Sequence, residues 1–190
     1  MSSQEAPDCI RNHRMRSMAD LASQTLSALR VRITRVFPSQ VRAALAAVDD
    51  EQIWWRPNDS SNSIGNLILH LNGSLNLYLN RNMGGLAYER DRPAEFAERR
   101  IIPRDELLRA FDSMVANAEA TFEGLDERSL SAPSPEPEKY QLLVEDLISV
   151  AVHVATHTGQ IVWIAKMLRE GSLHETWIQS HREHGGWPKK

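Results

Sequence analysis

Cysteine is almost missing from this chain of 190 residues, which has only Cys9. An internal disulfide is therefore excluded, which fits a reducing compartment. An excess of basic residues is missing too, since 22 lysines and arginines stand against 25 acidic residues and the formal net charge is −3. Because nucleic-acid binders need a basic surface, we expect no nucleic-acid partner.

Long hydrophobic runs are also missing. Residues 1–8 are polar and contain no apolar secretory core. The longest apolar stretches are broken by polar residues before they reach the roughly 20 residues that a membrane-spanning helix needs. We therefore expect a soluble, cytoplasmic protein without a membrane partner.

What the sequence does contain is helical periodicity. Apolar residues recur at helical spacing in four stretches, which are residues 18–48, 64–81, 102–125 and 140–169. No stretch alternates as a strand does, and no internal repeat is visible. The pattern predicts an all-α fold, with a four-helix bundle as its simplest form. Pro38 lies inside the first stretch and predicts a kink near Phe37 or a division into two helices.

The length suits a single domain. We assign residues 1–15 to a flexible N-terminal arm, residues 16–171 to the bundle and residues 172–190 to a polar C-terminal tail. Trp177 and Trp187 are candidate docking points within that tail.

Two connections carry further expectations. Residues 87–100 are dense in charge and predict a surface loop anchored by Phe96. Trp54 and Trp55 are adjacent in another connection, so they cannot face the same way. One is expected to anchor the loop to the core, and the other to line a pocket or a subunit contact.

Three histidines fall within the predicted helices. His153 and His157 are four residues apart in an apolar run, just over one helical turn, so both imidazoles project from one face. Gln160 follows on that face, and His70 lies in the second predicted helix. The arrangement suggests a metal site between two helices, with His70, His153 and His157 as ligands.

A single helical histidine is usually a hydrogen-bonded residue of the core or its boundary, and that interpretation stays open for His70. The pair is different, because two buried imidazoles side by side both need partners for their polar nitrogens. A divalent metal satisfies both, and neutral imidazole suits zinc, nickel and iron alike. Three histidines without a cysteine leave coordination positions open for a water, or for the thiolate of a low-molecular-weight thiol.

Polar residues near the histidines are candidates to orient them. Gln160 is the predicted cofactor-binding residue, since it is placed to bond a bound water or a ligand. Asp146 lies on the same helix near this face, and Asn66 and Ser74 flank His70. For each of them a solvated or capping role is an equal alternative. No glutamate is adjacent to either of the paired ligand histidines as an obvious general base, so the catalytic residues stay unassigned.

Gly73 lies inside the second predicted helix, close after His70. Glycine there costs roughly 1 kcal/mol relative to alanine. Close contact with another helix, or room beside the histidine, would explain its presence.

Two motifs resemble a known superfamily. Residues 61–74, Ser-Asn-Ser-Ile-Gly-Asn-Leu-Ile-Leu-His-Leu-Asn-Gly-Ser, preceded by Trp-Trp-Arg-Pro at 54–57, resemble the second-helix segment of the DinB-like superfamily. These are damage-inducible and metal-dependent-hydrolase-like four-helix bundles. Residues 153–161, His-Val-Ala-Thr-His-Thr-Gly-Gln-Ile, resemble its fourth-helix motif, and Asp-Arg-Pro-Ala-Glu-Phe at 91–96 resembles an uncharacterised bacterial branch.

The resemblance implies a metal-binding bundle with up-down-down-up connectivity, often a homodimer, and it places the three ligands on His70, His153 and His157. Some similar proteins are thiol-dependent transferases or isomerases, and others are described as hydrolases. Three interpretations stay open: an enzyme whose metal activates water or a thiol, a non-catalytic metal- or ligand-binding stress-response protein, and a metal-free interaction scaffold. The sequence selects neither the metal nor a small-molecule substrate.

Overall fold

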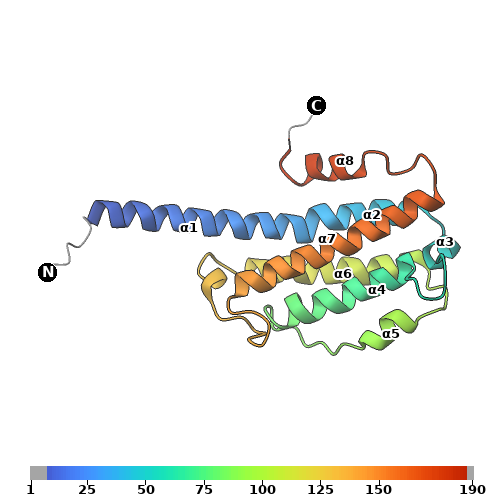
Figure 1. The fold of residues 1–190 in the computed structure, drawn as a ribbon, viewed down its shortest axis with the longest axis horizontal. Helices are drawn as coiled ribbons and strands as arrows, with labels where there is room; N and C mark the ends of the chain where they lie inside the picture. The colour runs from blue at the N-terminus through green and yellow to red at the C-terminus, as the bar shows by residue number, and fades with distance from the viewer. Residues whose placement is uncertain (1–7, 188–190) are drawn as a thin grey trace.

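The computed structural model describes residues 8–187, and every regular element in that range is a helix. Four long helical segments lie side by side (Figure 1). They are α1 (Asp8–Val31) continued by α2 (Phe37–Ala47), α4 (Ile64–Leu75), α6 (Arg104–Glu123) and α7 (Leu143–Leu168). The shorter helices are α3 (Asp50–Trp54), α5 (Arg92–Ala97), η3 (Ser129–Ser131) and α8 (Thr176–Glu183). The predicted all-α class is confirmed for this range.

The first segment is one continuous path through three helical stretches (Figure 1). The π-helical turn η1 (Arg32–Val36) joins α1 to α2, and Pro38 stands in the first turn of α2. A proline has no amide hydrogen, and its ring collides with the carbonyl four residues earlier in an α-helix. The wider turn just before Pro38 accommodates both defects, so the disruption predicted there takes the form of a π turn.

The N-terminal end of this segment begins earlier than expected. α1 starts at Asp8, so residues 8–15 are helical where the sequence suggested a loose arm. Residues 1–7 of the expected arm lie outside the described residues. The N-terminal part of α1 extends past the ends of the other long helices (Figure 1).

The core lies where α2, α4, α6 and α7 meet. Each contributes fully buried side chains, among them Leu45, Ile68, Met114 and Ile161. α7 packs against α2 and α4, and α4 packs against α6. By length and composition alone α7 is also apolar enough to cross a membrane. The core helix of a globular protein meets the same test, so the expected absence of a membrane partner stays a prediction.

The second helix continues past α4 through the π-helical turn η2 (Asn76–Arg81), which completes the predicted stretch 64–81. The connection after it differs from the expected surface loop, because it contains α5. Asp91 caps this helix by accepting a hydrogen bond from the Ala94 amide at 3.1 Å, and α5 packs against α4. The buried residue is Glu95, whereas Phe96, the expected anchor, is half-buried.

The two adjacent tryptophans divide as predicted. Trp54 is buried, and its Nε1 donates a hydrogen bond to the Ile102 carbonyl oxygen at 3.0 Å. Trp55 is exposed and lines a cleft.

The polar C-terminal tail contains a helix of its own, α8, which packs against α2. Gln40 Nε2 donates a hydrogen bond to Ser180 Oγ at 2.9 Å across this contact. His181 is buried beside two indole rings, with ring centroids 4.3 Å from Trp177 and 4.9 Å from Trp187. The tryptophans expected as docking points therefore pack on a histidine of their own segment.

Candidate metal centre

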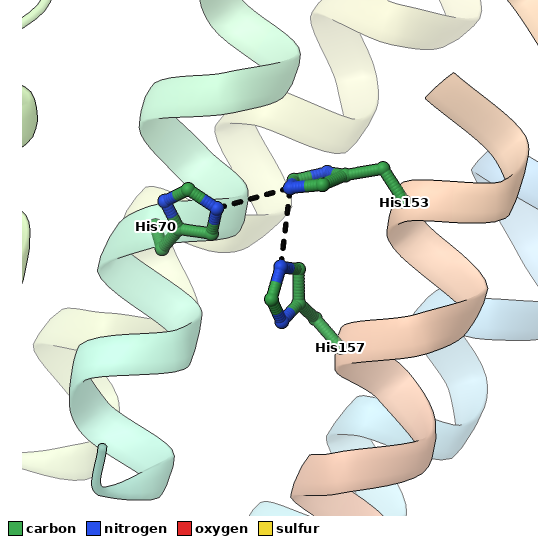
Figure 2. Close-up of side chains that lie close together, drawn as sticks. All are labelled: His70, His153 and His157. Atoms are coloured by element: carbon green, nitrogen blue, oxygen red, sulfur yellow. Dashed lines mark hydrogen bonds between the residues drawn. The ribbon is translucent and has the colours of Figure 1, made fainter. Parts of the chain in front are cut away.

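His70 of α4 and His153 and His157 of α7 turn their rings toward one point between the two helices (Figure 2). The Nε2 atom of His153 lies 3.0 Å from that of His70 and 3.1 Å from that of His157. The fold thus brings together the three histidines selected from the sequence, because α4 and α7 pack directly against each other.

The position of α4 is fixed at its N-terminus by a capping box. Ser63 Oγ accepts a hydrogen bond from the Asn66 amide at 3.1 Å, and Asn66 Oδ1 accepts one from the Ser63 amide at 3.3 Å. Asn66 Nδ2 also donates to the carbonyl oxygens of Glu95 and Glu98 at 3.0 and 3.2 Å. Asn66, a candidate to orient His70, therefore ties α4 to α5 and does not contact the ring.

Hydrogen bonds on the far side of two rings set where their protons lie. His70 Nδ1 is 2.9 Å from Glu95 Oε2, and His157 Nδ1 is 2.7 Å from Gln160 Oε1. A carboxylate and an amide oxygen only accept, so both Nδ1 atoms carry hydrogen and both Nε2 atoms present lone pairs. Arg90 Nη2 is also 3.1 Å from His70 Nδ1, but its shorter contact, 2.8 Å, is with Glu95 Oε2.

These tautomers have a consequence for the point where the rings meet. His70 and His157 both direct a lone pair at His153 Nε2, and that single nitrogen cannot donate a hydrogen to each of them. A cation at the common point would turn this arrangement into an attractive one.

The spacing of two of the three nitrogen pairs also suits a metal ion. Metal–nitrogen distances of roughly 2.0–2.1 Å place two ligand nitrogens about 2.9 Å apart at a right angle and about 3.3 Å apart at the tetrahedral angle. The two measured Nε2 separations, 3.0 and 3.1 Å, lie between these values. All three ligand nitrogens lie within 4.8 Å of one another, so the histidines converge closely enough to be candidate ligands of one ion.

Glu95 belongs to the candidate site although the sequence did not single it out. Arg90 grips its carboxylate with two hydrogen bonds, Nε to Oε1 at 2.7 Å and Nη2 to Oε2 at 2.8 Å. Both side chains are only 8% exposed. A Cβ on Gly73 would overlap this carboxylate, lying 2.7 Å from the Glu95 Cδ and 3.1 Å from Arg90 Nε. The glycine inside α4, noted as room beside the histidine, was the signal of this ion pair.

The surroundings favour the neutral form of two of the imidazoles, those of His70 and His153. Burial lowers the pKa of His70, although the hydrogen bond to Glu95 opposes the shift. Burial, followed by the neighbouring His157 and His70, lowers the pKa of His153 to about 4. Since a metal binds only the neutral ring, at neutral pH no proton has to leave these two rings before an ion enters.

The other predicted orienting residues have weaker links to the histidines. Ser74 Oγ lies 3.4 Å from His153 Nδ1, at the limit of a hydrogen bond. Asp146 is buried and hydrogen-bonded to the Ser134 hydroxyl, so it contacts neither ring, and burial raises its pKa. Both residues line a cavity of about 380 Å³ that His70 and His153 also border. Gln160 does reach the cluster, through His157.

Comparison with known proteins places the chain in a family. The family described as "Protein of unknown function (DUF1572)" matches residues 20–181, and it is a DinB-like family. Neither the curated proteins nor the solved structures contain a match to the chain. Because the matched range includes all three histidines, Glu95 and most of the fold, the chain belongs to the DinB-like family DUF1572.

Proposed function

We propose that this protein binds one divalent metal ion through His70, His153 and His157, on a DinB-like four-helix bundle with up-down-down-up connectivity. The observation that carries the proposal is the pair of hydrogen bonds behind the rings, donated by His70 Nδ1 to Glu95 and by His157 Nδ1 to Gln160. They fix the tautomers that direct lone pairs inward, as in metal centres whose histidines are held from behind. Zinc, nickel and iron all suit three imidazoles with positions left open.

Metal analysis tests this directly. Protein purified without a histidine tag should contain about one divalent ion per chain by inductively coupled plasma mass spectrometry. His153→Ala together with His157→Ala should abolish binding. The matched control replaces His174 and His184, two exposed histidines outside the cluster, and should bind metal as the wild type does. Equal metal content in the His153/His157 variant and the His174/His184 variant would contradict the proposal.

We further propose that the ion serves catalysis, in a metal-dependent hydrolase or a thiol-dependent transferase. Three protein ligands leave positions for a water or a thiolate, which a bound metal would supply as a nucleophile at neutral pH. The cavity of about 380 Å³ beside His70 and His153 gives room for a small substrate. Hydrolase and thiol-transfer screens on native and metal-stripped protein test this, with circular dichroism to confirm that the stripped protein is still folded.

One observation favours a second candidate, a non-catalytic metal- or ligand-binding protein of a stress response. Glu95, the carboxylate nearest to the cluster, has both oxygens occupied by Arg90 and His70, so it is not free to act as a base. Loss of folding together with the metal, and no activity in either screen, would favour this candidate over the enzyme.

We propose that the protein is a cytoplasmic homodimer. Four large apolar side chains support self-association, because they lie along one exposed face of α7: Ile148, Val152, Trp163 and Met167. Sedimentation equilibrium should give twice the chain mass of 21.5 kDa. Val152→Glu should shift the protein toward the monomer, and Leu21→Glu, at an equally exposed leucine of α1, should not.

A further inference from the structure

The cavity beside the histidines has a strongly polar wall. It lies against α4 and η2 on one side and the beginning of α7 on the other, with His70 and His153 at its edge. Three cationic side chains also line it: Arg90, Arg92 and Lys139. A small cavity with three cations and a metal site at one edge is suited to an anion, provided that the cations are not already neutralised.

Two of the three cations have carboxylate partners. Arg90 is held by Glu95 as described, and Lys139 forms a partly exposed ion pair with Glu136, whose side chain is 19% exposed. Partly exposed ion pairs of this kind contribute little to stability. Arg92 forms no ion pair with any residue that the structure describes. The cavity therefore contains one cation, Arg92, without an ion-pair partner, and a second, Lys139, whose ion pair is partly exposed.

Arg92 is nevertheless held at a defined place. Its guanidinium carbon lies 5.0 Å from the centre of the Phe96 ring, which lies 4.7 Å from the centre of the His70 ring. Cation–π contact fixes the guanidinium while leaving its N–H donors free. The three groups follow one another from the His70 ring through the Phe96 ring to the Arg92 guanidinium. Because Phe96 and Arg92 both belong to α5, this helix sets the distance between His70 and the Arg92 charge.

Hydroxyl groups and two carboxylates complete this wall. Of the carboxylates, Glu136 is paired with Lys139 and Asp146 is hydrogen-bonded to the Ser134 hydroxyl. Tyr140 donates a hydrogen bond to Ser149 Oγ at 2.7 Å, and the hydroxyl groups of Ser74 and Tyr78 also belong to the lining. Lys139 Nζ sits 5.1 Å from the centre of the Tyr78 ring. Hydroxyl groups of this kind are able to hydrogen-bond the oxygen atoms of either a carboxylate or a phosphate.

The cleft on the other side of the histidines has a different character. It has a volume of about 300 Å³ and is bordered by Trp55, Trp163 and Gln160, and none of its lining residues is charged. A charged group would lose its hydration there without gaining a partner. Of the two hollows, the cavity lined by Arg92 is therefore the one suited to an anion.

We infer that the cavity binds a small organic anion, a carboxylate or a phosphate ester, with its acidic group between Arg92 and Lys139 and the rest of the molecule extending toward His70 and His153. The inference rests on the proposed function, because the ion adds positive charge at that end of the cavity. It names the class of the substrate or ligand, which the histidines alone do not.

Titration calorimetry on the zinc-loaded protein tests the inference with three probes: malonate, inorganic phosphate and the uncharged malonamide. Malonate or phosphate should bind, and malonamide should not. The preference between the two anions separates a carboxylate site from a phosphate site. Arg92→Gln and Lys139→Met should each lower the affinity for the anion about tenfold, as expected for the loss of one charge-assisted hydrogen bond.

Matched controls keep the result interpretable. Arg109→Gln and Lys166→Met remove the same charges from exposed positions on α6 and α7 outside the cavity, and they should leave anion affinity unchanged. Unchanged affinity in the Arg92→Gln, Lys139→Met double variant would mean that the metal alone holds the anion, and would overturn the inference. Equal binding of malonamide would overturn it too.

The two proposals fail in different ways. Metal content is measured on every variant before titration, and Arg92→Gln should retain the full complement. If the histidine double variant retains its metal, the proposed metal site is wrong, whereas the Arg92 comparison still decides whether the cavity selects anions.

Discussion

The carboxylate of Glu95 accepts a hydrogen bond from His70 Nδ1 at 2.9 Å, although the two residues belong to different helices and are 25 positions apart. Arg90 holds the same carboxylate through both of its oxygens. The orientation of one candidate metal ligand is therefore set by a short helix in a connection and not by the helix that carries the ligand.

Replacing Glu95 by glutamine should weaken metal binding about 10- to 100-fold, because the charged acceptor behind His70 is lost. Competition with a chromophoric chelator gives the affinity, and circular dichroism checks the fold. Glu89→Gln, at an exposed position of the same connection, is the control and should bind as the wild type does. Equal affinities in the two variants would show that Glu95 does not support the site.

Gly73→Ala should displace the Glu95 carboxylate, since the new methyl group would stand 2.7 Å from the Glu95 Cδ. We expect a loss of about 1–3 kcal/mol in the free energy of unfolding, as for other overpacked sites, together with weaker metal binding. Gly159→Ala is the matched control, because a Cβ there meets no atom within 4 Å. It should stabilise α7 by about 0.5–1 kcal/mol. Urea denaturation measures both; equal effects would refute the steric explanation.

Gln160→Ala should remove the acceptor from His157 Nδ1 and lower metal affinity by less than the Glu95 change, because this hydrogen bond is exposed and its acceptor is neutral. Gln160→Glu restores an acceptor at the same place and should recover the affinity. If the glutamate variant binds no better than the alanine variant, the role of Gln160 lies elsewhere, for example in contacting a ligand.

The ion pair between Arg30 and Glu119 ties α1 to α6 and predicts a pH dependence. Hydrogen bonding from Arg30, at 2.7 Å, lowers the pKa of Glu119 to about 2 from its ordinary 4.5. A carboxyl whose pKa falls on folding stabilises the folded state above pH 4.5, and this contribution is lost as the pH falls toward 2.

Glu119→Gln should therefore cost about 1–2 kcal/mol at pH 7, after allowance for the partial exposure of the pair, and progressively less below pH 4.5. Urea denaturation at a series of pH values measures the difference. Glu123→Gln, whose side chain is 64% exposed, should cost much less at pH 7. A difference between wild type and Glu119→Gln that does not shrink in acid would contradict the assignment.

The sequence reveals the parts of this fold in which an apolar pattern repeats over several helical turns. Each of the four long helices repeats its apolar face over several turns, and the spacing of His153 and His157 follows directly from that geometry. The disruption at Pro38 was predictable for a different reason. It depends only on the proline and its neighbours in the same helix.

The short helices were not predictable in this way. α5 has six residues and α8 has eight, too few to establish a period, and both lie in polar sequence. Glu95 looks like a surface charge because its partner, Arg90, and the glycine that makes room for it are recognised only once α5 lies against α4. Gly73 showed that something approached the helix closely, but not which side chain.

α5 carries three residues of the candidate site within about one and a half helical turns. Glu95 orients the ligand, Phe96 stacks on its ring, and Arg92 carries the free charge of the cavity. A descendant of this chain that exchanged the connection between α4 and α6 would alter the proposed metal site and the proposed anion site in the same step. Sequence changes in this connection would therefore affect both sites together, without any change in α4 or α7, the helices that carry the histidines.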